Sequence, residues 1–195
     1  MKYYAVKQGK KPGIYSTWEE CKAQVHGFPG AIYKKFEDEA LAKAFISGEQ
    51  VVPKINPNDT VAYVDGSYDV ATHRFSYGAV IIHNKEEYEL SEAFSDERWA
   101  DMRNVAGEIR GAMAAITWAT ENKVEKLIIY HDYEGISRWP LGEWKAQKEC
   151  TKAYVQFVKD HRDVEVTFMK VKAHSGNILN DRADLLAKEA LKDSD

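Results

Sequence analysis

The sequence predicts an α/β protein: a mixed five-stranded sheet with helices on both faces, preceded by a small α+β domain. Beyond residue 60, three consecutive strand patterns precede an alternation of helical and strand patterns. That order is typical of an antiparallel meander continued by crossover connections, whose helices cover both faces of the sheet. Before residue 48, a shorter run of three strand patterns and two helix patterns indicates a separate unit.

The small unit begins with two strand patterns joined by a glycine-containing turn. Thr17 is placed to cap the helix that follows, and Glu20 stands in the capping-box position three residues later. The expected strands cover residues 3–7, 13–16 and 31–36, and a second helix is expected over residues 37–46.

A linker is expected over residues 49–59, where Pro53 and Pro57 interrupt a stretch with neither helical nor strand period. About 11 residues reach at most roughly 36–40 Å when fully extended. We therefore predict two domains, residues 1–48 and residues 60–195, that stay close together.

The larger domain has a longer series of elements. Its central helix is predicted from apolar residues at helical spacing, such as Val105, Ile109 and Met113. The expected strands are 60–65, 74–83, 87–94, 126–132 and 165–171. The expected helices are 104–121, 134–139, 149–161 and 180–191.

Composition limits the class of protein. The 195 residues are 44% hydrophobic, which is enough for a substantial core. Cys21 and Cys150 form neither a disulfide framework nor a zinc-binding spacing, so we interpret both as free thiols. The first residues lack the apolar segment of a signal peptide, and no apolar run approaches transmembrane length. We expect a cytoplasmic protein with no membrane partner, and we take it to be a monomer.

The net charge of −4 by itself argues against a nucleic-acid partner. The distribution of charge points the other way. Residues 1–48 carry 8 Lys and Arg against 5 Asp and Glu, whereas the remainder carries 19 against 26. A basic module joined to an acidic one suits a protein whose small domain holds a polyanion. A solvated surface would explain the same asymmetry.

Four acidic residues stand at or near the ends of expected elements. Asp65 and Asp132 each close an apolar strand. Glu108 lies one turn into an Ala-rich helix, and Asp184 opens the last helix. Strand ends are where an open α/β sheet forms its crevice. Carboxylates gathered there repel one another unless a hard cation such as Mg²⁺ neutralises them, so the pattern indicates a metal-dependent phosphoryl-transfer site.

The stretch from Val171 to Asp184 reads VKAHSGNILNDRAD. It resembles the strand, histidine loop and helix-opening Asn-x-x-Ala-Asp of the type-1 ribonuclease H family, and Asp65, Glu108 and Asp132 match the family's other acids in order. The resemblance covers about residues 60–191. It implies a ribonuclease H-like fold and an endoribonuclease that hydrolyses the RNA strand of RNA–DNA hybrids. The expected products carry 5′-phosphate and 3′-hydroxyl ends.

The resemblance also implies a site for two divalent ions, with Mg²⁺ expected and Mn²⁺ tolerated. Asp65 would bridge the ions, and Asp184 would complete the ion on the nucleophile side. Glu108 and Asp132 would hold the ion on the leaving-group side. His174 would assist proton transfer or product departure.

Two of these assignments have alternatives. Asp181 and Asp184 share a helix face, so their spacing alone does not choose between them. The family's ligand aspartate lies ten residues beyond the loop histidine, which selects Asp184. Asp181 then stands where the family often has a second acid, close to the metal ligands but not bound to the metal itself. His131 and Asp132 could instead be the His-Asp pair of a metal phosphohydrolase, but that motif belongs on a helix and needs further histidines.

The segment before Glu108 is where this family contacts the minor groove of its substrate. Asn104 matches a groove-contacting asparagine, and Arg103 stands where the family commonly holds a DNA phosphate. Thr151 is a candidate for a second phosphate contact, and helix capping is an equal alternative. The segment after Asp132 is too short for the basic protrusion that some members carry.

Residues 2–46 resemble the N-terminal hybrid-binding domain of many type-1 ribonucleases H, which is related to the viroplasmin module. The resemblance implies that Trp18 and Tyr33 face deoxyriboses of the DNA strand. Lys34 and Lys35 would meet phosphates, and Tyr4 would add a hydroxyl to the same pocket. A role as core anchors is the alternative for the two aromatic residues.

Two rival functions remain at this point. A non-catalytic hybrid-binding protein would bind the hybrid without cutting it. A nuclease of the same fold could instead cut double-stranded RNA or DNA.

Overall fold

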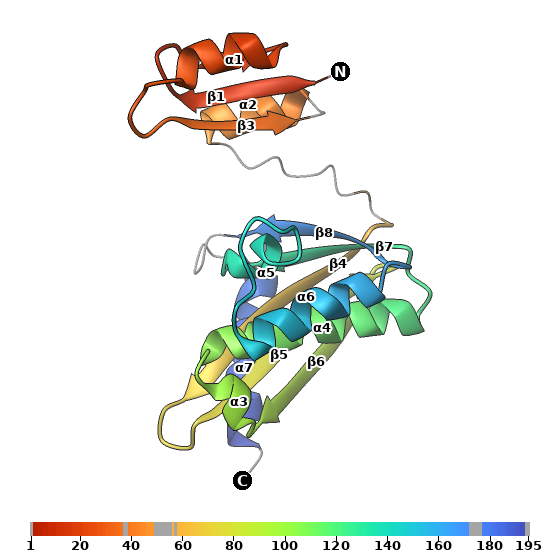
Figure 1. The fold of residues 1–195 in the computed structure, drawn as a ribbon. Coiled ribbons are helices and arrows are strands. Elements are labelled where there is room, and N and C mark those ends of the chain that lie inside the picture. Colours follow the sequence, from red (N-terminus) through yellow and green to blue (C-terminus); the bar gives the residue numbers. More distant parts are fainter. Residues whose placement is uncertain (1, 37–38, 49–55, 57, 172–176, 194–195) are drawn as a thin grey trace. The chain divides into compact units, whose positions relative to one another are not determined.

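The computed structural model describes residues 2–36, 39–48, 56, 58–171 and 177–193. The chain divides into two compact units, Met1–Lys54 and Ile55–Asp195. Figure 1 shows both units, with most of their helices and strands labelled.

The first unit is a three-stranded antiparallel sheet with two helices. The strand order is β2-β1-β3. The elements are β1 (Tyr3–Gln8), β2 (Gly13–Tyr15), α1 (Trp18–Val25), β3 (Ile32–Phe36) and α2 (Glu39–Ser47). The capping box of α1 is present as predicted, because the Thr17 side chain accepts from the backbone of Glu20 and the Glu20 carboxylate accepts from the backbone of Thr17.

The second unit has a five-stranded mixed sheet in the order β6-β5-β4-β7-β8 (Figure 1). Its strands are β4 (Thr60–Asp69), β5 (Arg74–His83), β6 (Glu86–Phe94), β7 (Lys126–His131) and β8 (Glu165–Lys170). The pairs β4–β5 and β5–β6 are antiparallel, whereas β4–β7 and β7–β8 are parallel. The predicted meander followed by crossovers is therefore confirmed.

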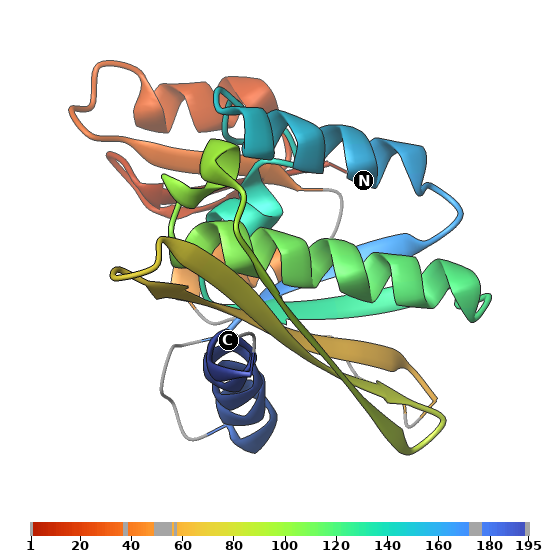
Figure 2. The same ribbon diagram turned by 90° about the horizontal axis from the view of Figure 1, so that it is seen from below.

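Helices cover both faces of this sheet, as Figure 2 shows. The helices are α3 (Glu97–Ala100), α4 (Asn104–Glu121), α5 (Gly135–Arg138), α6 (Glu149–Asp160) and α7 (Ile178–Lys192). Along β4, Ala62 and Val64 pack with α4 and α6, and Val61 and Tyr63 pack with α7. This alternation follows from the two-residue period of a strand.

Two glycines let the helices that carry acidic residues approach the sheet closely. A Cβ on Gly107 of α4 would lie 1.9 Å from the carbonyl oxygen of Ser76 in β5. A Cβ on Gly78 of β5 would lie 2.1 Å from the carbonyl oxygen of Ala183 in α7. Each contact lies within one residue of an acid, because Glu108 follows Gly107 and Asp184 follows Ala183.

Three details differ from the sequence prediction. Helix α3, capped by Asp96, was not predicted. Strand β4 continues to Asp69 instead of ending at Asp65, because β5 pairs with it along its whole length. Helix α7 begins two residues earlier than expected, since the Asn177 side chain accepts from the backbone N–H groups of Leu179 and Asn180 and caps it.

Within the described residues, no helix combines the length and apolar character needed to cross a membrane.

Candidate active site

The site lies where β7 ends beside the longer strand β4. The parallel pairing of these strands stops at Tyr63 and Tyr130, and β4 runs on alone on that side. Asp132 directly follows the last residue of β7. Asp65 is therefore inside β4 and not at its end, which corrects the sequence prediction. Beyond Tyr63, β4 is no longer paired with its neighbour β7.

Asp65, Glu108 and Asp132 come together as the sequence predicted. One carboxylate oxygen from each lies within 4.8 Å of the others. The Glu108 side chain is buried, at 1% exposure. Its Oε1 accepts hydrogen bonds from the backbone N–H of Asp132 at 3.0 Å and of Tyr133 at 3.3 Å. The turn after β7 thus presents Asp132 and holds Glu108 at the same time.

Burial and crowding change the proton affinity of Asp65 and Glu108. Burial, followed by the negative charge of Asp132, raises the pKa of Asp65 to about 7, although the Gly66 N–H that donates to its Oδ1 opposes the shift. Burial also raises the pKa of Glu108 well above its ordinary value, and Asp132 and Asp65 add to the effect. Without a cation, the site therefore favours protonated carboxyl groups.

Asp184 lies near this cluster, and its charge is one of those that raise the pKa of Asp65. Its carboxylate accepts from the Lys188 ammonium one turn along α7, at 2.6 Å. Lys188 also acts on Asp65, in the opposite direction. Asp181 is exposed. The described structure therefore sets Asp184, rather than Asp181, beside the three clustered acids.

This donor set fits a hard divalent cation. Three carboxylates within reach of one another, one of them buried, supply the oxygen ligands that Mg²⁺ and Mn²⁺ take. The predicted His174 lies outside the described residues. His131 does not belong to the acidic group, since its Nδ1 faces the Tyr133 carbonyl at 2.9 Å. The His-Asp metal pair considered from the sequence is thus not formed by this ring nitrogen.

In the first unit, the strand register sorts the predicted binding residues by face. Tyr4 pairs with Lys35 and Val6 with Tyr33, so these four share the face that α1 covers. Trp18 of α1 joins them, with its ring 6.0 Å from that of Tyr4 and 5.8 Å from that of Tyr33.

The exposure of these aromatic rings separates them from the core of the unit. Trp18 is 40% exposed and Tyr33 is 45% exposed. The buried cluster of this unit consists instead of Val6, Cys21 and Val25. The role of core anchor considered from the sequence is therefore not the one that the structure gives to these two rings.

Lys34 alternates onto the other face of this sheet, where its ammonium lies 5.8 Å from the centre of the Phe36 ring.

Both units match known families. Residues 57–192 match the RNase H family, and residues 2–46 match the Ribonuclease H1 N-terminal domain. The chain belongs to the ribonuclease H family. The resemblance recognised in the sequence is thereby confirmed, and so is its assignment to an enzyme family.

Individual relatives extend over the same regions. Mouse (Mus musculus) Ribonuclease H1 is 25% identical over 259 residues, covering 99% of this chain and 90% of its own. Synechocystis Ribonuclease HI is 30% identical over 155 residues, covering 71% of this chain and 91% of its own. The crystal structure of LC11-RNase H1, isolated from compost, in complex with an RNA/DNA hybrid matches with a TM-score of 0.57 at 19% identity. It covers 69% of this chain and 98% of that one, and it supports the ribonuclease H fold.

The residues expected to line the substrate groove of this ribonuclease H fall into two groups. Asn104 and Arg103 are exposed at the start of α4, and the Arg103 guanidinium lies 5.9 Å from the centre of the Tyr68 ring. Thr151 is 2% exposed, and its hydroxyl donates to the carbonyl of Lys148 and accepts from its N–H. The capping role left open by the sequence is the one that Thr151 performs, so we withdraw it as a phosphate contact.

An aromatic cluster follows Asp132 that sequence reasoning did not assign to the site. The rings of Tyr133, Trp139 and Trp144 lie within 5.8–6.2 Å of one another. Trp144 is 38% exposed, and the Arg138 guanidinium lies 5.8 Å from the centre of its ring. The two tryptophans in a short segment were the sequence feature that could have indicated this cluster. Only the fold, however, brings them against Tyr133.

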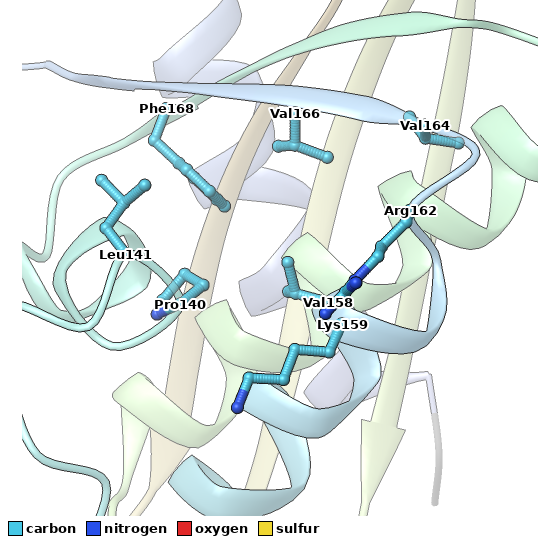
Figure 3. A pocket seen from close by; sticks show the side chains of 8 residues that line it. All are labelled: Pro140, Leu141, Val158, Lys159, Arg162, Val164, Val166 and Phe168. Atoms are coloured by element: carbon cyan, nitrogen blue, oxygen red, sulfur yellow. The ribbon is translucent and has the colours of Figure 1, made fainter.

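A separate groove lies along β8 (Figure 3). It is lined by Pro140, Leu141, Val158, Lys159, Arg162, Val164, Val166 and Phe168. None of the clustered acids lines it, so it does not belong to the acidic site.

Proposed function

We propose that this member of the ribonuclease H family is an endoribonuclease that hydrolyses the RNA strand of RNA–DNA hybrids by a two-metal mechanism. The products would carry 5′-phosphate and 3′-hydroxyl ends. The observation that carries the proposal is the convergence of Asp65, Glu108 and Asp132 within 4.8 Å, in a chain of this family. Two of these carboxyl groups, Asp65 and Glu108, have a raised pKa, and such perturbed acids cluster at functional sites.

The proposed roles follow the positions of the side chains. Asp65, Glu108, Asp132 and Asp184 would hold the ions, with Mg²⁺ as the expected metal and Mn²⁺ as an alternative. Two such ions supply the Lewis acidity that activates water and stabilises the departing oxyanion. Lys188 neutralises Asp184 in the described structure and would be released from it when a cation binds. His174 is proposed to assist proton transfer or product departure.

Selection of the hybrid is proposed to come from both units. Tyr4, Trp18, Tyr33 and Lys35 form an aromatic and cationic face on the first unit, suited to deoxyriboses and phosphates. Lys34 is proposed as a further phosphate contact. In the second unit, the exposed Asn104 and Arg103 would contact the minor groove and a DNA phosphate. The structural relative LC11-RNase H1 forms a complex with an RNA/DNA hybrid, which supports this choice of substrate.

The two units are proposed to have separate roles. Residues 1–48 would bind the hybrid, residues 60–195 would cut it, and residues 49–59 would link them. A monomeric state and a cytoplasmic location stay predictions.

The proposal is tested with one labelled RNA strand presented alone, in an RNA–RNA duplex and in an RNA–DNA hybrid. A labelled DNA duplex completes the set, and each substrate is incubated with Mg²⁺ and with chelator. Cleavage restricted to the hybrid and abolished by chelator is expected, with products that a 5′-phosphate-dependent exonuclease degrades. Binding of the hybrid without cleavage would favour the non-catalytic rival. Cleavage of the RNA–RNA or DNA duplex would favour the rival in which the enzyme is a nuclease of double-stranded RNA or DNA.

A further inference from the structure

His131, the last residue of β7, has a fully buried side chain, and its ring makes one hydrogen bond to the part of the chain that the structure describes. Its Nδ1 lies 2.9 Å from the backbone carbonyl oxygen of Tyr133. Because a carbonyl oxygen only accepts, Nδ1 carries the proton and Nε2 of the neutral ring is an acceptor. Among the described residues, Nε2 has no hydrogen-bond partner. The imidazole ring makes a T-shaped contact with the ring of Phe168, which offers no polar group.

The carbonyl that His131 holds belongs to the turn that organises the acidic site. The N–H groups of Asp132 and Tyr133 both donate to Oε1 of Glu108. The Tyr133 residue is therefore fixed at both its backbone polar groups, by Glu108 at the N–H and by His131 at the carbonyl. The backbone carbonyl of His131 in turn accepts from Val171, the residue after β8.

This arrangement has a cost that packing does not explain. A buried acceptor without a partner costs roughly 1–3 kcal/mol, and an apolar side chain of similar size would avoid that cost. What distinguishes the imidazole from an apolar residue here is its one donated hydrogen bond.

We propose that His131 is a positioning residue for the metal site: through the Tyr133 carbonyl it holds the turn in the orientation that directs Glu108 and Asp132 toward a divalent cation. The inference rests on the proposed role of these acids as metal ligands. Groups that orient metal ligands in this way typically change metal affinity or activity by about 10–100-fold when removed.

The test uses three variants of the full chain. His131→Leu removes the donor and fills the space with hydrocarbon. His131→Asn retains a donor nitrogen attached to Cγ, where Nδ1 is, whereas His131→Gln carries its amide one bond further out. Mn²⁺ alone is titrated into each protein, free Mn²⁺ is followed by electron paramagnetic resonance, and melting temperature is recorded in chelator. Cleavage rates against Mg²⁺ concentration are measured in parallel.

The matched control is His161→Leu. His161 also bonds a backbone carbonyl through Nδ1, that of Phe157 at 2.8 Å, but it lies at the end of α6, before the start of β8. The start of β8 pairs with the start of β7, at the opposite end from Asp132. This variant is expected to bind Mn²⁺ as the unmodified protein does.

The expected result is Mn²⁺ affinity lowered about 10–100-fold in His131→Leu, with a melting temperature in chelator that is unchanged or raised. His131→Asn should recover affinity to within a few-fold, and excess Mg²⁺ should restore much of the cleavage rate of His131→Leu. If His131→Leu does not fold, the Asn and Gln pair decides, since only Gln should weaken binding. If all folded variants bind Mn²⁺ with equal affinity, the role of His131 is overturned. The proposed function still stands in that case, provided that the unmodified protein cleaves the hybrid. Failure of the unmodified protein to bind Mn²⁺ overturns both.

Discussion

Asp65 and Glu108 are held in positions where neither carboxyl group favours ionisation. Burial is the first cause and the neighbouring acids are the second, as the raised pKa values of both groups show. At neutral pH and without cations, the burial and mutual repulsion of these carboxylates lower the free energy of unfolding. A divalent cation that binds the folded state alone offsets the repulsion and stabilises the protein by mass action.

Asp65→Asn is expected to stabilise the protein in chelator at pH 8. The folded pKa of about 7 lies above the ordinary value of 3.8, so ionisation of Asp65 opposes folding above pH 7. That penalty disappears as the pH falls from 7 toward 4. We expect a gain of about 2–4 kcal/mol at pH 8 and little difference at pH 4, measured by urea unfolding. A variant that is less stable than the unmodified protein at pH 8 in chelator would contradict this explanation.

Asp184→Asn is expected to reduce hybrid cleavage by at least about 100-fold, because it removes a ligand beside the three clustered acids. Asp181→Asn is the matched control, on the same helix and exposed, and it should retain activity within a few-fold. Initial rates at saturating Mg²⁺ provide the comparison. A nearly normal Asp184→Asn enzyme beside an inactive Asp181→Asn enzyme would reverse the assignment.

At this scale, the sequence predicted the acids that carry the chemistry but not the residues that hold them. Asp65, Glu108 and Asp132 were identified by type and order, and the structure gathers them. Thr151 was ambiguous because a hydroxyl at a helix start suits both capping and phosphate binding. The roles of His131 and Lys188 depend on contacts with a backbone carbonyl and an acid that only the folded chain defines.

Among the elements, α4 and α7 determine where two of the site's acids lie. Both approach the sheet through glycine contacts that no larger residue permits, at Gly107 and Gly78. The helices themselves were predictable from apolar spacing, because that spacing is local. The start of α7 and the extension of β4 were not, since a cap at Asn177 and pairing with β5 decide them. Helix α3 is too short to show a period in the sequence.

Gly107→Ala tests the close approach of α4. Helix propensity alone would make this change stabilising by about 1 kcal/mol. The added Cβ would lie 1.9 Å from a backbone oxygen, so we expect a net loss of about 2–4 kcal/mol and lower activity as Glu108 is displaced.

Gly111→Ala, one turn further along α4, serves as the control for that variant. Its Cβ would lie 3.3 Å from the nearest side-chain atoms, so it should cost much less. Melting temperature and hybrid cleavage are measured together. Equal behaviour of the two variants would show that the approach at Gly107 does not position Glu108.

For the whole molecule, the charge difference between residues 1–48 and the rest of the sequence corresponds closely to the division into two compact units. The first has an aromatic and cationic face, and the second has an acidic cluster. This separation predicts that binding and chemistry respond to different substitutions. The binding face of the first unit could not be predicted from the sequence, because charge counts do not show which side chains share a face.

Lys35→Ala and Trp18→Ala are expected to raise the KM for a hybrid severalfold and leave kcat nearly unchanged. Lys35→Ala should also reduce the slope of log affinity against log salt by about 1, as the loss of one phosphate contact requires. Lys7→Ala is the control, because its ammonium lies over the Phe45 ring of α2 and away from Trp18. A fall in kcat with constant KM would place these residues in the chemistry instead.

The most direct test of the account is the initial rate of RNA-strand cleavage in an RNA–DNA hybrid, measured against Mg²⁺ concentration for the unmodified protein and for Asp65→Asn. We predict no cleavage without Mg²⁺, a saturable rise with it, and a rate at least about 1,000-fold lower in Asp65→Asn at every concentration. Cleavage that persists in chelator, or that survives in a folded Asp65→Asn protein, would contradict a metal-dependent site built on these carboxylates.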